Sequence, residues 1–343
     1  MKLLYRILIC FSFYSCIKDK PQEPEKTSVT INAESKVLIS NEGNFGWGSG
    51  SISLYDPSSN SVIENYYQQQ NNGGSLGNVC QSITKHQSNY YVVVNNSNKI
   101  VVINANDFVK MATINGFNSP RYLLPITYNK AYVSDLYANS IQIVDLNSNS
   151  IAGSIPCLHG TEEMALIYNK AFITNTNSDY CYVVNTVTDI ITDSLNVGKG
   201  AASIVIDKNS KVWVLSSGNS ALSQSGKLSR INPVNLQIEQ QFNFNAGESP
   251  NKLCINKTKD TLYFLNNGIY QFLISSSTLP SNALIAQGSK LYYGLGINPK
   301  DYTIYVSDAI DYVQKSKIEL YKPNGNFITN FNAGIISNGF CFE

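Results

Sequence analysis

Residues 41–50, NEGNFGWGSG, gather side chains suited to binding an organic molecule. The segment contains four glycines, one carboxylate, two asparagine amides, Phe45 and Trp47. It separates two short apolar runs, where a turn of about two to five residues is usual. The two rings could stack on a flat ligand while Glu42 and Asn44 supply polar contacts. Alternatively, the rings fold back onto the sheet from which the loop emerges.

Further amides, carboxylates and aromatic side chains occupy equivalent segments along the chain. Arg121 could bind an anionic group of a ligand bidentately, or pair with Glu162 or Glu163. Asn and Asp at the ends of strands also cap turns through their own side chains, which is the structural alternative for them. The predicted ligand-contacting residues outside the first loop are Asn96, Arg121, Tyr122, Asp135, Tyr137, Glu162, Asn177, Asn219, Asp308 and Tyr312.

The patterns that mark enzymes are missing from the sequence. The two histidines, His86 and His159, lie far apart, and neither a Gly-x-Ser-x-Gly elbow nor a Cys-x-x-Cys-His haem site occurs. The carboxylates form no recognised Ca²⁺ loop, and no histidine cluster fits a transition metal. We therefore predict no catalytic residue, no cofactor and no metal.

A repeat of about forty residues must position these side chains. A short β-branched or aromatic run followed by a polar residue recurs seven times, with the polar residue at Asn41, Asn95, Asp135, Asn175, Ser216, Asn266 and Asp308. This period, with Asn, Asp, Gly and Ser turns, is typical of propeller blades. The sequence predicts an all-β, seven-bladed propeller over residues 36–343, with four antiparallel strands in each blade.

The first repeat lacks an inner strand upstream of it. The run Gly339-Phe340-Cys341-Phe342 supplies a strand of the right kind, so we predict that it completes the first blade and closes the ring. In such a ring, the loops between second and third strands share one face with the blade-to-blade connections. The candidate residues should converge on that face around the central channel.

The N-terminal residues predict export. Lys2 and Arg6 precede a short apolar run, and Ser15-Cys16 resembles a lipobox. We predict a signal peptide and lipobox over residues 1–16, with Cys16 acylated, and a charged tether over residues 17–35. A plain secreted protein is the alternative. The lipoprotein interpretation attaches the protein to a membrane through its lipid anchor only.

Charge and cysteine content narrow the partners further. Without Lys2 and Arg6 the formal net charge changes from +1 to −1, which argues against nucleic acid as a ligand. Cys10 and Cys16 lie in the predicted signal peptide and lipobox. The other five cysteines are scattered and odd in number, so they fit small buried residues better than a disulfide framework. One disulfide among them is left as an alternative.

The segments AYVSD, AFITN and IYVSD resemble the YVTN-type repeat of the YncE-like family. NEGNFGWGSGSISLYD, SLGNVCQSI, VVVNNSNKIVVI, SPRYLL and IYVSDAIDYVQKSKI resemble a narrower group, the lipid-anchored DUF5074 propellers of Gram-negative bacteria. Members of that group capture cobalamin and pass it to a TonB-dependent outer-membrane receptor, and a related group captures ferric siderophores. The resemblance implies a location at the outer membrane, exposed at the cell surface. It also implies capture there of a small-molecule ligand, a corrinoid or a siderophore, without fixing which.

Three classes of function follow from these observations. The first is a non-enzymatic capture protein for a scarce nutrient, cobalamin-like as first choice, which hands its ligand to a TonB-dependent receptor. The second is a surface propeller that binds protein or glycan. The third is an enzyme, which the missing catalytic patterns disfavour.

Overall fold

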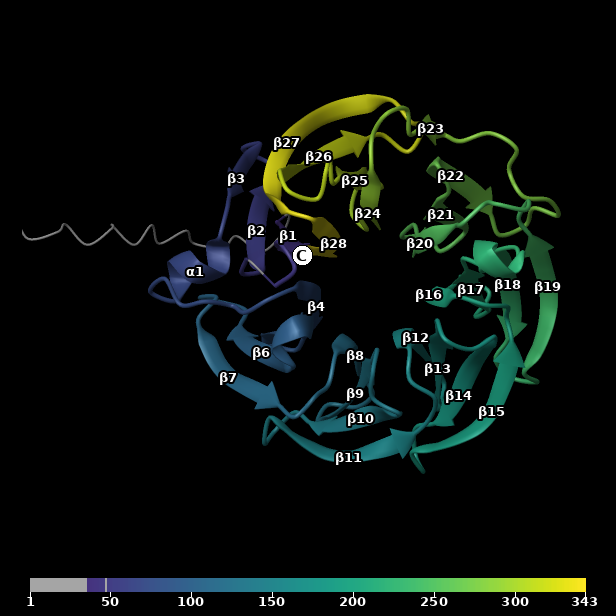
Figure 1. The fold of residues 1–343 in the computed structure, drawn as a ribbon, viewed down its shortest axis with the longest axis horizontal. Coiled ribbons are helices and arrows are strands. Elements are labelled where there is room, and N and C mark those ends of the chain that lie inside the picture. The colour runs from purple at the N-terminus through teal and green to yellow at the C-terminus, as the bar shows by residue number, and fades with distance from the viewer. Residues whose placement is uncertain (1–35, 47) are drawn as a thin grey trace, which may run out of the picture. The chain divides into compact units, whose positions relative to one another are not determined.

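The computed structural model describes residues 36–46 and 48–343. They form seven four-stranded antiparallel sheets arranged in a ring, which confirms the seven-bladed β-propeller predicted from the repeat (Figure 1). The predicted signal peptide, Cys16, the tether and Trp47 lie outside the described residues.

Each blade runs from an inner strand near the axis of the ring to an outer strand at its rim. Blade 1 contains β28 (Ser337–Phe342), β1 (Val37–Asn41), β2 (Ser51–Asp56) and β3 (Ser61–Ile63). Blade 2 contains β4 (Cys80–His86), β5 (Asn89–Val94), β6 (Lys99–Asn104) and β7 (Lys110–Asn115). Blade 3 contains β8 (Pro120–Pro125), β9 (Lys130–Asp135), β10 (Ser140–Asp145) and β11 (Ser150–Pro156). Blade 4 contains β12 (Thr161–Ile167), β13 (Lys170–Asn175), β14 (Tyr180–Asn185) and β15 (Ile190–Asn196). Blade 5 contains β16 (Ala201–Ile206), β17 (Val212–Ser216), β18 (Lys227–Asn232) and β19 (Gln237–Asn243). Blade 6 contains β20 (Asn251–Ile255), β21 (Thr261–Leu265), β22 (Gly268–Leu273) and β23 (Ile285–Ala286). Blade 7 contains β24 (Tyr292–Ile297), β25 (Ile304–Asp308), β26 (Lys315–Tyr321) and β27 (Phe327–Ile335).

The second strand of each blade is buried on both of its faces. β1, β17, β21 and β25 are buried at every residue, because each is sandwiched between the neighbouring blades. Their β-branched and aromatic side chains suit a strand buried on both sides. The outer strand β19 instead alternates exposed and half-buried residues, as a strand with one solvent-facing side should.

The hydrophobic core consists of layers between adjacent blades. Trp213 of blade 5 packs against Phe272 of blade 6, with ring centroids 5.7 Å apart, and its indole nitrogen donates to Asp207 at 2.8 Å. Val93 of blade 2 and Val133 of blade 3 belong to another such layer. Each blade is therefore stabilised by its neighbours, which is what makes closure of the ring important.

Strand β28 closes the ring as predicted. It pairs antiparallel with β1 through Val37 opposite Phe342 and Ile39 opposite Phe340. Blade 1 is thus built from two segments that lie far apart in the sequence (Figure 1).

The rim of blade 1 differs from the repeat pattern. Its outer strand has only three residues, and the chain then forms the short helix α1 (Tyr66–Gln70). Tyr66 and Tyr67, which the repeat placed in an extended segment, are buried with Phe108 of blade 2 in one cluster. No helix among the described residues is long and apolar enough to cross a membrane.

Candidate functional site

The inner strands carry a repeated irregularity near their first residues. In every blade the pairing of the inner and second strands shifts there by one extra residue on the inner strand. Such β-bulges redirect side chains and are common beside binding sites. The residues at these positions, which we call the bulge set, are Gln81, Arg121, Glu162, Ala202, Lys252, Tyr293 and Asn338.

The bulge set lies toward the face predicted from the sequence, which we call the upper face. This face carries the connections between second and third strands and the blade-to-blade connections. The polar connection after β1 reaches the bulge set directly, because the Tyr293 hydroxyl donates to both Glu42 carboxylate oxygens at 3.1 and 3.2 Å.

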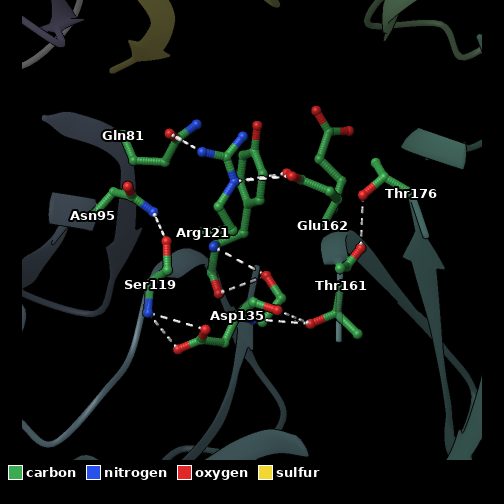
Figure 2. A network of polar contacts seen from close by, with 12 residues as sticks. Gln81, Asn95, Ser119, Arg121, Asp135, Thr161, Glu162 and Thr176 are labelled. Carbon is green, nitrogen blue, oxygen red and sulfur yellow. Dashed lines mark hydrogen bonds and ion pairs between the residues drawn. The ribbon is translucent and has the colours of Figure 1, made fainter. Parts of the chain in front are cut away.

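Arg121 joins three blades at the axis (Figure 2). Its Nε donates to the two Glu162 carboxylate oxygens at 2.9 and 3.0 Å, and its Nη1 donates to the side-chain oxygen of Gln81. Of the two roles that the sequence left open for Arg121, the structure therefore contains the ion pair with Glu162. Such a charge-assisted arrangement fixes the guanidinium in one orientation.

Lys252 extends the same network across the ring. Its ammonium group donates to the side-chain oxygen of Asn338, whose amide nitrogen donates to the backbone oxygen of Gln81 at 3.0 Å. The ammonium nitrogen also lies 5.6 Å from the centre of the Tyr293 ring, within range of a cation–π contact. Residues of six blades, all but blade 5, are thereby linked around the axis.

Three charged groups in this region, Glu42, Glu163 and Lys252, have no oppositely charged partner within ion-pair distance among the described residues. Glu163, next to Glu162 on β12, accepts a hydrogen bond from the Ile204 amide at 3.1 Å. Neither Glu163 nor Lys252 forms an ion pair within the described residues. Burial raises the pKa of Glu163 to about 7, although Lys252 and the Ile204 amide act in the opposite direction. Burial also lowers the pKa of Lys252, because desolvation disfavours the charged form.

A cavity of about 190 Å³ continues from these residues along the inner strands. Glu163, Lys252 and Tyr122 line it, and burial raises the pKa of the Tyr122 hydroxyl well above its usual value. Both charged residues keep partial contact with solvent. The interior of the ring therefore combines a polar network near the upper face with a small pocket beneath it.

The residues that close the second strands have a different role. Asp135 is fully buried, and its carboxylate accepts hydrogen bonds from the amides of Asn118, Ser119, Tyr137 and Ala138 at 2.9 to 3.0 Å. Figure 2 shows the hydrogen bonds from Ser119. We expected Asp135 to contact a ligand. This geometry corresponds to the structural alternative, because every hydrogen bond joins its carboxylate to the loops of its own blade.

Asp308 is held in the same way. One carboxylate oxygen accepts from the amides of Leu291 and Ile310, both at 2.9 Å. Asn175 accepts from the amides of Asn177 and Ser178 at 2.8 Å and donates to the carbonyls of the preceding connection. We call Asn41, Asn95, Asp135, Asn175, Ser216, Asn266 and Asp308 the strand-closing set, all of which are buried.

The remaining predicted residues divide into two groups. Glu42, Arg121, Tyr122 and Glu162 lie together at the axis, where they influence one another electrostatically. On the connections of the upper face, the exposed members are Phe45, Asn96, Tyr137, Asn177 and Tyr312, and the half-buried ones are Asn44 and Asn219. Tyr312 also packs edge-on against Tyr293, with ring centroids 5.8 Å apart.

The connection after β1 has features of a binding loop. Phe45 is 70% exposed, so its ring is not folded onto its own blade. Gly43 and Gly46 have a φ of +75°, a backbone conformation that glycine adopts without strain. Gly48 and Gly50 do not, and Gly50 has another role: a Cβ there would lie 2.5 Å from the Cys80 amide nitrogen, so only glycine permits this close approach.

Several residues of the site were not predicted, namely Gln81, Glu163, Lys252, Tyr293 and Asn338. A positional signal could have found most of them. In blades 2 to 7 the bulge residue precedes the strand-closing residue by 13 to 15 positions, so counting back from the repeat locates it. Its side chain varies from blade to blade, which hides it from a search for a common motif.

The described residues contain neither a disulfide nor a cluster of metal-ligating side chains. The five cysteines of the described residues are free, so no disulfide joins them. Residues 36–46 and 48–343 contain no group of three or more His, Cys, Asp and Glu placed to hold a metal ion.

Comparisons with solved structures agree on the fold. A quinonprotein alcohol dehydrogenase-like protein from Bacteroides thetaiotaomicron has a TM-score of 0.69 at 15% identity, with 90% of this chain and 78% of that chain covered. A periplasmic gluconolactonase from Pseudomonas aeruginosa has a TM-score of 0.69 at 11% identity, with 90% and 98% covered. A functionally unknown protein from Desulfotomaculum acetoxidans has a TM-score of 0.66 at 13% identity, with 90% and 98% covered.

At these identities the likeness shows a shared fold and carries no function. No match was found among curated protein sequences. The model of a family described as a domain of unknown function, DUF5074, matches residues 36–335, and the chain therefore belongs to this family.

Proposed function

We propose that this protein is a non-enzymatic ligand-capture protein that binds a large polar organic molecule on the upper face of the propeller. The observation that carries the proposal is the bulge set, in which Arg121, Glu162 and Lys252 converge with Glu42 at one end of the ring. Ligand contacts there would combine charged groups at the axis with exposed aromatic side chains around them.

Energetics support a functional role for this convergence. Burying charges is costly, and apolar side chains of similar size often give equal or greater stability. Perturbed pKa values at a concave site are a further indication of function. Glu163, with its pKa raised to about 7, and Lys252, with its pKa lowered, fit that description.

The finer part of the proposal concerns the ligand and its fate. We place a corrinoid first, with a ferric siderophore as the alternative, and a TonB-dependent outer-membrane receptor as the recipient. The resemblance of the loop and strand segments to capture propellers supports this choice. A lipid anchor at Cys16 would hold the propeller at the cell surface, which the N-terminal sequence supports.

A second function is favoured by the apolar side chains of the upper face. Leu222 and Val313 are 65% and 64% exposed on two of its connections, and Tyr137 is 68% exposed on a third. A propeller that binds protein or glycan through this face would use such side chains as anchors. It would not need the charged groups at the axis, which makes the two functions separable.

A ligand screen by thermal shift tests the proposal. Corrinoids, ferric siderophores and glycans are added in turn, and a ligand at about a hundred times its Kd should stabilise the fold by about 2.7 kcal/mol. The bound compound is then recovered and compared with the starting compound by mass spectrometry. We expect it unchanged, whereas conversion would contradict the non-enzymatic proposal.

A matched pair of variants locates the binding face. Tyr137 on the upper face and Tyr128 on the opposite face are 68% and 70% exposed. Tyr137→Ala should weaken binding by about 1 kcal/mol or more, as loss of an aromatic anchor does, and Tyr128→Ala should leave it unchanged. If Tyr128→Ala weakens binding and Tyr137→Ala does not, the ligand site is on the other face.

A further inference from the structure

The cavity inside the ring differs in character from the upper face. Its polar wall is formed by Glu163, Lys252, Tyr122 and Asn338. Farther along the inner strands its wall is mainly apolar, with Leu295, Phe340 and Cys254. It also contains Thr84, whose hydroxyl donates to the backbone oxygen of Leu123 at 3.1 Å. At about 30 Å³ for each water, its volume of about 190 Å³ has room for roughly six water-sized groups.

The polar wall presents one positive and one negative group that do not neutralise each other directly. Lys252 Nζ donates to Asn338, and Glu163 accepts from the Ile204 backbone. Within the part of the chain that the structure describes, no ion pair involves either residue. A ligand that carries both a carboxylate and an ammonium group could pair with the two side chains at once, which would offset the cost of burying their charges.

We propose that this cavity binds a small zwitterionic amino acid, with its carboxylate at Lys252 and its ammonium group at Glu163. The apolar wall would receive a short hydrocarbon side chain. The cavity lies beneath the large-ligand site of the proposed function and shares Lys252 with it, but binding in the cavity does not require a large ligand on the upper face.

The alternatives fit the pocket less well. A simple carboxylate would pair with Lys252 and leave Glu163 buried without a cation, and a simple amine would leave Lys252 without an anion. An uncharged molecule would satisfy neither group. The volume of about 190 Å³ suits a small ligand, of the size of alanine or valine, better than a large one.

Isothermal titration calorimetry of the exported propeller tests the proposal. Glycine, alanine, valine and 5-aminovalerate are titrated up to about 10 mM, with isobutyrate and isobutylamine as singly charged analogues of valine. We expect at least one zwitterion to bind with one-to-one stoichiometry, at least about tenfold more tightly than either analogue. Absence of binding by every zwitterion would overturn the proposal, whatever happens with corrinoids or siderophores.

Variants then place the ligand in the cavity. Lys252→Met and Glu163→Gln should each weaken binding of the best zwitterion by at least about tenfold, because each leaves one ligand charge unpaired. Lys208→Met is the control, since Lys208 pairs with Asp260 elsewhere on blades 5 and 6 at 3.4 Å. A zwitterion that binds both cavity variants as well as wild type would overturn the assignment. Thermal unfolding checks that each variant is folded, and Glu163→Gln preserves the acceptor for the Ile204 amide if Lys252→Met fails to fold.

Discussion

Every blade contributes one residue to the strand-closing set and one to the bulge set, but the two sets differ in chemistry. The strand-closing set contains only Asn, Asp and Ser, and most of its hydrogen bonds stay within the loops of one blade or its neighbour. The bulge set contains seven residues of seven types, several of which bond across the axis. We infer that the uniform strand-closing residues maintain the structure of each blade. The bulge residues differ between blades and can therefore form one binding site together at the axis.

The largest expected effect comes from removing the strand that brings both sets together in blade 1. Deleting residues 339–343 removes most of β28, including Phe340 and Phe342, which pair with β1. We expect the free energy of unfolding to fall by more than about 4 kcal/mol, since loss of one buried Phe side chain already costs about 3–5 kcal/mol. Urea unfolding measures this change.

The control for the deletion removes only the ion pair that its last residue makes. Lys85 lies 3.3 Å from Glu343, and Lys85→Ala should cost less than about 1 kcal/mol, as half-exposed pairs do. A truncated chain with an unchanged midpoint would contradict the role of β28 in closing the ring.

Asp135→Ala tests the strand-closing set. It leaves four buried or half-buried amides without their acceptor, so we expect a loss of about 3 kcal/mol in unfolding free energy. Asp145 closes the third strand of the same blade and accepts from one amide, at 2.8 Å. Asp145→Ala should therefore cost about 1 kcal/mol or less. If both variants lose the same unfolding free energy, the residue that closes the second strand contributes no more to stability than the residue that closes the third.

Glu163→Gln tests the opposite expectation for a residue that lies beside the bulge set. Burial raises the pKa of Glu163 from 4.5 to about 7, so the folded state binds its proton more tightly than the unfolded state. The stability that this proton provides is lost as pH rises from about 4.5 through 7. Glu163→Gln should therefore raise the unfolding free energy by about 2 kcal/mol at pH 8 and by less at pH 5.

The neighbouring residue supplies the matched control. Glu162 pairs with Arg121, so Glu162→Gln should lower the unfolding free energy by about 3 kcal/mol, because it leaves a buried guanidinium without its anion. Denaturant unfolding of both variants at pH 5 and pH 8 makes the comparison. Destabilisation by Glu163→Gln at pH 8 would show that the Glu163 carboxylate is paired after all.

The smallest effect on stability is expected on the upper face itself. Phe45→Ala removes a ring that is 70% exposed and should change the unfolding free energy by no more than about 0.5 kcal/mol. Binding of a large ligand identified by the screen should weaken by about 2 kcal/mol, which titration of wild type and variant measures. A large loss of stability with unchanged affinity would mean that Phe45 supports its own blade.

The sequence was sufficient for the fold because the strand-closing residues make the repeat visible. Asp135 and Asp308 recur at the same place in their units, and the missing first strand follows once the units are aligned. The helix α1 was not predicted, since five residues are too few for a helical period and Tyr66 and Tyr67 suit a strand equally well.

The site was only partly predictable for the opposite reason. Arg121, Tyr122 and Glu162 were selected because they stand out chemically among loop residues. Lys252 and Glu163 do not stand out, and their proximity depends on the bulges and on the packing of inner strands from different blades. Single-sequence patterns record neither, because both are properties of the closed ring.

The pairing of β1 with β28 also sets the order in which the molecule can assemble. Closing a loop of roughly three hundred residues costs about 3 kcal/mol more chain entropy than closing a hairpin of ten. Blade 1 is therefore expected to be the last to form and the first to open, and Gln81 can meet Asn338 only after it has closed. A ligand that spans the axis would slow this opening, and if only the unliganded ring opens, the lifetime of the ring would rise by the factor 1 + L/Kd, where L is the free ligand concentration.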